Sequence, residues 1–119
     1  MAKSRLSGYT WILQSWTVGG KPQVWLLDHK ITLAFNDLAQ PHQLSGSTGG
    51  NRYVAIYSAA GERLQMTHIG ETLARVLPQE LESQELRYMS AFRQITRYRL
   101  DEGILTLQDD SGDIILRYG

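Results

Sequence analysis

Apolar and polar positions alternate with a period of two along most of this chain. Such alternation is typical of β-strands with one buried face, because successive side chains of a strand point to opposite sides. In the first segment, Tyr9, Trp11 and Leu13 fall on one face and Trp16 falls on the other. Glycine-containing turns separate the segments. The pattern predicts strands within residues 9–16, 31–35, 51–58, 63–66, 97–100, 105–107 and 114–118.

One segment in the second half follows a helical period instead. Pro78 suits the first turn of a helix, where its missing N–H costs nothing, and Glu80 and Glu82 lie near the positive end of the helix dipole. Apolar residues then recur at steps of three and four, which predicts a helix over about residues 78–95 with one apolar stripe. The stripe consists of Leu81, Tyr88, Met89, Phe92 and Ile95.

The order of these elements predicts an α+β fold. Short strands joined by tight turns pair antiparallel, because parallel neighbours need longer crossovers. The expected architecture is a strongly curved, mostly antiparallel sheet or incomplete barrel that is packed by one α-helix. With 119 residues and no visible linker or repeat, the chain is expected to form a single domain over residues 1–119.

Composition narrows the classes of partner and chemistry. Twelve basic residues balance twelve acidic ones, so long-range attraction to nucleic acid is not expected. Arg93, Arg97 and Arg99 around Tyr98 are interpreted as a solvated face. The absence of cysteine excludes disulfides and thiolate metal sites. Neither a secretory signal nor an apolar run of about 20 residues is present, so no transmembrane segment is expected, and the compartment stays open.

The stretch LSGSTGGNRYVAIY, residues 44–57, concentrates small residues before a strand-like run. It is not a phosphate-binding P-loop, because no Gly-Lys-Ser/Thr follows and the next element is a strand rather than a helix. Glycine permits unusual backbone angles and close approach, and asparagine bonds readily to nearby backbone. We therefore expect a strand corner or bulge, with Asn51 buried and hydrogen-bonded across the fold.

Several short motifs follow one another along the chain. They are Gly8 and Trp11 in GYTW, the apolar strand ITLAF, Gly46, Gly49, Asn51, Tyr53 and Tyr57 in GSTGGNRYVAIY, Thr72 and Pro78 in TLARVLP, Glu85 with Tyr88 in the helix, and Tyr98, Gly103, Leu105, Leu107 and Gly112 near the end. As an ordered set over about residues 6–118, they resemble the META-domain family, which includes the HslJ-like heat-shock proteins.

The resemblance implies a compact, mostly antiparallel fold with one helix. It also implies a bacterial protein associated with stress or the cell envelope, often exported, in a family without an established catalytic centre. The motif residues Gly46, Gly49, Asn51, Tyr57, Thr72 and Glu85 are expected to be structural. Gly50 stands where the family's signature cysteine lies, and Val76 or Leu77 occupies the second cysteine position. If those cysteines pair in relatives, Gly50 should lie close to Val76 or Leu77.

Glu85 is the sharpest chemical candidate, because it falls on or beside the apolar stripe of the helix. It could act as an acid or base, or it could tie donors from the Asn51 corner and fix the helix on the sheet. His29, His42 and His68 are scattered and form no metal-binding spacing. No catalytic residue, metal site or cofactor is therefore expected.

Trp16 and Trp25 lie next to turns rich in glycine and proline. They are the expected contact surface for a protein partner or an apolar small molecule, since curved sheets leave grooves at their edges. The function predicted from the sequence is a non-enzymatic domain that binds such a partner. The alternative is a small enzyme that uses Glu85 as an acid or base.

Overall fold

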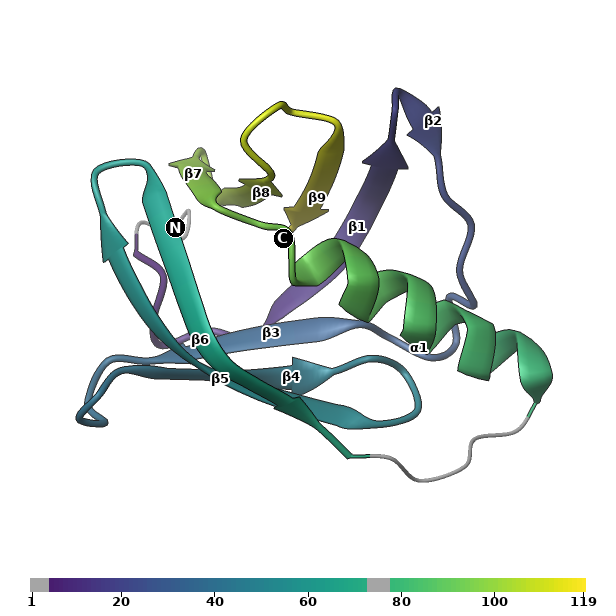
Figure 1. Ribbon diagram of the computed structural model, residues 1–119, viewed down its shortest axis with the longest axis horizontal. Coiled ribbons are helices and arrows are strands. Elements are labelled where there is room, and N and C mark those ends of the chain that lie inside the picture. Colours follow the sequence, from purple (N-terminus) through teal and green to yellow (C-terminus); the bar gives the residue numbers. More distant parts are fainter. Residues whose placement is uncertain (1–4, 73–77) are drawn as a thin grey trace.

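A computed structural model describes residues 5–72 and 78–119, which form nine strands and one helix (Figure 1). The strands are β1 (Trp11–Val18), β2 (Lys21–Pro22), β3 (Thr32–Asn36), β4 (Gln43–Ser47), β5 (Arg52–Ala60), β6 (Arg63–Glu71), β7 (Arg97–Asp101), β8 (Ile104–Gln108) and β9 (Ile114–Tyr118). The helix α1 spans Gln79–Phe92.

Eight of the strands close into an antiparallel barrel. Neighbours from β3 to β9 pair in chain order, and β1 joins the two ends by pairing with β3 at Trp11–Leu33 and with β9 from Leu13 onward. The short β2 only extends the end of β1. The expectation of an incomplete barrel was therefore wrong, because one long strand belongs to both edges of the curved sheet.

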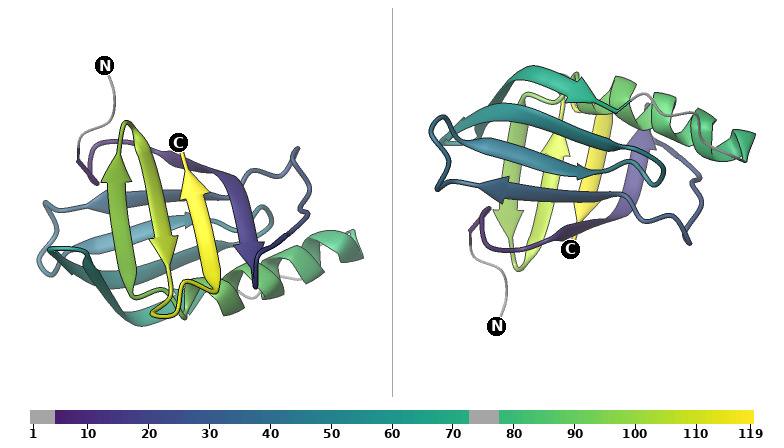
Figure 2. Two further views of the ribbon diagram at one scale, coloured as in Figure 1. Left: turned by 90° about the horizontal axis from the view of Figure 1, so that it is seen from above. Right: turned by 90° about the horizontal axis from the view of Figure 1, so that it is seen from below.

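The barrel is flattened into two layers whose strands cross steeply. Figure 2 shows β7, β8, β9 and β1 passing over β3, β4, β5 and β6. The helix lies at one end of the barrel. Its last turn is near the centre of the molecule, and its first turn protrudes beyond the barrel (Figure 1). It is shorter than the expected 78–95, because Pro78 is the N-cap in an extended conformation and the turns after Phe92 tighten.

A β-bulge in β1 changes the side on which Trp16 lies. The pairing of β1 with β9 shifts register between Leu13 and Ser15, which adds one residue to β1. Trp16 therefore points to the same side as Trp11 and Leu13, and all three are buried. The strict alternation that placed Trp16 on the opposite face was wrong for this reason.

The strand β4 occupies part of the glycine-rich stretch that we expected to be a corner. Gly46 lies within β4, opposite Tyr53 of β5. A Cβ at Gly46 would collide with the carbonyl oxygen of Thr32 and lie 2.6 Å from the Tyr53 hydroxyl oxygen. Glycine is needed here for close approach, and the corner itself follows at residues 48–51.

Aromatic side chains fill the interior. Phe92 packs against Tyr53, with ring centroids 4.9 Å apart, and against Tyr88 at 5.6 Å. The buried hydroxyl groups of Tyr53, Tyr88 and Tyr118 form a chain of hydrogen bonds. The Tyr88 hydroxyl lies 2.9 Å from that of Tyr53 and 2.7 Å from that of Tyr118. Tyr53 also donates to the Thr32 carbonyl at 2.6 Å. The barrel interior is thus joined to α1 by packing and by hydrogen bonds.

Burial raises the pKa of Tyr53, Tyr88 and Tyr118 above the ordinary value. In the unfolded chain these groups lose their protons near pH 10, whereas in the folded protein they keep them. Their contribution to stability is therefore complete below about pH 10 and is lost as the pH rises further. These three groups together should lower the free energy of unfolding by about 4 kcal/mol per pH unit. Burial and the nearby Asp37 also raise the pKa of Tyr57, which adds to this fall.

Urea unfolding between about pH 9 and pH 11.5, followed by circular dichroism and by tyrosinate absorbance, tests this expectation. The tyrosinate absorbance of Tyr53, Tyr88 and Tyr118 should appear only together with loss of structure. Full ionisation of all six tyrosines in a protein that keeps its native spectrum would contradict it.

Candidate functional site

The corner after β4 is held by reciprocal hydrogen bonds between Thr48 and Asn51. The backbone N–H of Thr48 donates to the Asn51 carbonyl at 2.9 Å, and the Asn51 N–H donates to Thr48 Oγ1 at 3.0 Å. Both residues are buried. The turn therefore presents the Asn51 side chain toward the interior, as expected from the sequence.

The Asn51 amide links three elements. Its Nδ2 donates to Glu85 Oε2 on α1 at 2.7 Å, and its Oδ1 accepts from the hydroxyl of Thr72 at 2.7 Å. Thr72 Oγ1 in turn accepts from the backbone N–H of Arg52 at 3.0 Å. Thus the motif residues Asn51, Thr72 and Glu85, which lie far apart in the sequence, form one continuous polar chain.

The surroundings of Glu85 bear on its two possible roles. The residue is 7% exposed, and its bond to Asn51 involves an amide that does not titrate. An acid or base needs access to substrate and a second group to exchange protons with. The geometry favours the structural role, in which a buried carboxyl group satisfies a buried donor and ties the helix to the corner.

Gln84, the residue before Glu85, holds the long segment between β2 and β3. Its Oε1 accepts from the backbone N–H of Leu26 at 2.7 Å, and its Nε2 donates to the carbonyl oxygens of Thr48 at 3.1 Å and His29 at 3.4 Å. Gly49 makes room for this, because a Cβ there would lie 2.6 Å from Gln84 Nε2. Its φ of +99° is also one that glycine adopts readily.

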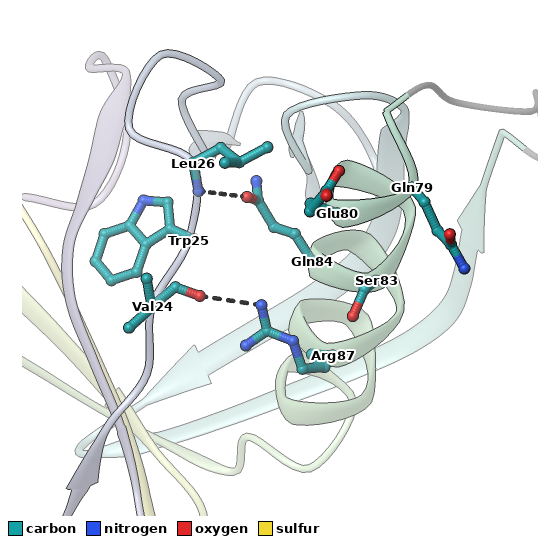
Figure 3. A pocket seen from close by; sticks show the side chains of 8 residues that line it. All are labelled: Val24, Trp25, Leu26, Gln79, Glu80, Ser83, Gln84 and Arg87. Carbon is teal, nitrogen blue, oxygen red and sulfur yellow. Dashed lines mark hydrogen bonds between the residues drawn. The ribbon is translucent and has the colours of Figure 1, made fainter.

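A groove of about 480 Å³ runs between α1 and this segment (Figure 3). One wall is mainly apolar and the other is the polar side of the first helical turns. Val24, at the apolar wall, is 81% exposed. The groove is lined by Val24, Trp25, Leu26, Gln79, Glu80, Ser83, Gln84 and Arg87.

Arg87 closes one end of the groove. Its guanidinium donates to the Val24 carbonyl at 3.0 Å, a bond drawn in Figure 3, and lies 5.2 Å from the centre of a Trp16 ring. Trp16 also contacts Trp25 and Tyr88, at centroid distances of 6.2 and 6.0 Å. Trp16 is only 2% exposed, so it supports the groove from the protein interior through its contact with Trp25. Of the two tryptophans expected to form the contact surface, only Trp25 lines the groove.

The other expected residues lie elsewhere. Tyr57 is buried edge-on against Phe35, with centroids 5.0 Å apart, and belongs to the core. Val76 and Leu77, which we expected near Gly50, lie outside the described residues. Over residues 5–72 and 78–119, no group of three His, Cys, Asp or Glu side chains is arranged to hold a metal ion.

The residues that shape the groove most strongly were missed by sequence reasoning. Gln84 and Arg87 looked like ordinary polar helix positions, and Val24 lies in a segment without periodicity. The one hint in the sequence was that Gln84 lies next to the motif residue Glu85. The burial of Gln84 follows from the position of the helix on the barrel, so the local pattern does not predict it.

The fold and the motif residues together define a small β-barrel domain with one docked helix. The family model described as META domain matches residues 4–119, so the chain belongs to the META domain family. This confirms the family suggested by the ordered motifs. A comparison with curated proteins found no significant match.

Solved structures share the fold. A protein from Burkholderia xenovorans, solved by NMR, is 23% identical with a TM-score of 0.78, covering 95% of this chain and 81% of that one. A DUF4847 family protein from Bacteroides vulgatus ATCC 8482 is 14% identical with a TM-score of 0.73, covering 96% and 93%. At these identities the likeness concerns the fold alone.

In the described part of the chain, no helix has both the length and the apolar character needed to cross a membrane.

Replacing Gln84 should loosen the groove wall. In Gln84→Leu the Leu26 N–H and two carbonyl groups lose their partner, so the free energy of unfolding should fall by about 2–3 kcal/mol. Amide exchange at Leu26 should accelerate at the same time. Denaturant unfolding and hydrogen exchange measured by NMR check both effects.

The matched control is Gln94→Leu, just beyond α1, where the exposed side chain donates only to the Ser90 carbonyl. It should change stability by less than about 0.5 kcal/mol. Equal effects of the two substitutions would show that Gln84 does not hold the segment.

Proposed function

We propose that this META domain is a non-enzymatic binding module whose groove between α1 and residues 24–26 takes an apolar ligand or an apolar segment of a partner protein. The observation that carries the proposal is the exposed apolar wall of the groove. Val24 is 81% exposed next to the partly buried Trp25, opposite a helix wall that offers polar groups for orientation. Sites of this kind, mainly apolar with a few fixed polar groups, are typical of ligand pockets.

The rigidity of the groove supports this role. Gln84 and Arg87 fix the backbone of the segment at Leu26 and Val24 through hydrogen bonds from the helix side. A ligand therefore meets a largely preformed surface, which lowers the ordering cost of binding. The acid–base alternative for Glu85 is disfavoured by its bond to Asn51 and by its absence from the groove lining.

Membership of the META domain family and the resemblance to HslJ-like heat-shock proteins favour a bacterial accessory role under stress or at the cell envelope. In that setting the occupant of the groove would be a partner protein or an apolar small molecule rather than a substrate. The site residues of this proposal are Trp25 and Val24 as the apolar contact, with Trp16 behind them.

The proposal is tested with the apolar fluorescent probe 1-anilinonaphthalene-8-sulfonate. Val24→Asp should weaken binding of the probe about 10-fold, because a charge is placed on the apolar wall, which corresponds to about 1.4 kcal/mol. Trp25→Ala should weaken it by a similar factor. Fluorescence titration at neutral pH gives the dissociation constants.

Leu38→Asp is the control, since Leu38 is 90% exposed in the turn between β3 and β4 and does not line the groove. Probe binding should be unchanged in this variant. Equal loss in the Leu38 and Val24 variants, or no loss in either, would contradict the proposed site.

A further inference from the structure

The barrel has a seam at which two neighbouring strands barely pair. The strands β6 and β7 share one register position, Arg63 opposite Arg97. It is flanked by bonds from the Leu64 N–H to the Thr96 carbonyl at 3.0 Å and from the Tyr98 N–H to the Glu62 carbonyl at 2.9 Å. The partner segment ends at this point, because the residues that precede Thr96 lead away from β6 to α1. In the described part of the chain, no strand covers this edge of β6 after Leu64.

The backbone of Met66 faces this open edge. Leu64 points its N–H toward β7, and alternate residues of a strand direct their backbone groups to the same side. On the other side, Met66 lies opposite Tyr57, whose own N–H is directed to the carbonyl of His42, the residue just before β4. Met66 therefore does not exchange hydrogen bonds with β5. Among the described residues, the N–H and C=O of Met66 have no main-chain partner, so they can pair with an incoming main chain.

A groove of about 530 Å³ lies along the same edge. Leu64 and Ile95 are buried and Met66 is half-buried, so the groove has an apolar floor where inward side chains of an added strand could pack. Polar and charged residues form its rim. These rim residues are Arg63, Gln65, Thr67, Arg93 and Thr96.

The charges around the seam favour an acidic occupant. Arg63 and Arg97 approach Asp110 at 2.7 and 3.7 Å, and Arg93 approaches Glu71 at 2.9 Å. Three guanidinium groups thus face two carboxyl groups, which leaves one positive charge in excess. Arg63 and Arg93 have side chains that are 57% and 44% exposed, so both can reach a second carboxylate.

The open edge is short. The pairing of β5 with β6 shifts register between the pair Ile56–Thr67 and the pair Val54–Gly70. Within this shift, His68 has a φ of +54°. A bulge of this kind turns the strand away and stops it from extending a ladder. The edge therefore suits a short extended segment better than a long strand of another sheet.

We propose that the seam between β6 and β7 is a second binding site, which takes an extended peptide segment with an acidic side chain by adding it as a strand beside Leu64–Thr67. Main-chain bonds to Met66 supply affinity, the apolar floor accepts alternate side chains, and Arg63 or Arg93 binds the carboxylate. This site lies apart from the groove at Val24 and shares no lining residue with it.

The test uses a capped six-residue peptide of alternating threonine and valine with one central glutamate, added to ¹⁵N-labelled protein. At saturation, amide exchange at Met66 should slow by at least about 10-fold. Single N-methylation at each peptide position in turn should weaken binding with a period of two, because only alternate N–H groups face β6. Replacing the glutamate by glutamine should also weaken binding, and more at low than at high salt.

Three results would overturn the proposal. One is no binding at about 1 mM peptide. Another is N-methylation acting equally at all positions or at none, which would exclude strand addition. The last is protection of Met66 that rises with protein concentration in the absence of peptide, which would assign the edge to a second copy of this chain. Because the peptide itself is modified, none of these outcomes depends on a variant that must fold.

Discussion

The buried hydrogen bond between Asn51 and Glu85 is the constraint on which the rest of the structure depends. A carboxyl group on the apolar side of a helix would oppose docking unless a donor met it inside the protein. The corner after β4 supplies that donor, and Thr72 holds the other side of the same amide. One polar chain thus fixes the helix relative to β4, β5 and the end of β6.

Once the helix is fixed, neighbouring positions on it shape both proposed sites. Gln84 and Arg87 reach the segment before β3 and form the groove at Val24, while Tyr88 enters the barrel and completes the chain of buried hydroxyls. At its other end, Arg93 borders the open edge of β6. The candidate surfaces therefore arise from the way in which α1 closes one end of the barrel, rather than from a separate insertion.

Local patterns in the sequence predicted most strands, the helix, the corner and the special position of Glu85. They could not predict closure, because the pairing of β1 with β9 joins opposite ends of the chain and has no local signature. A single bulge moved Trp16 from the expected outer face to the interior. The strand β4 was hidden because Gly46 disfavours strands, yet the space beside Thr32 and Tyr53 admits no side chain. The groove was missed because Val24 becomes part of a surface only through contacts with the helix.

The most direct test of this account is a double-mutant cycle of Asn51→Ala and Glu85→Ala, with the free energy of unfolding measured by urea titration for all four proteins. If the two side chains hold the helix on the corner as a unit, each single substitution should be strongly destabilising. The second should then cost much less when the first is present, with a coupling energy of about 1–3 kcal/mol. Additive effects, with coupling near zero, would show that the bond does not organise the structure and would contradict the account.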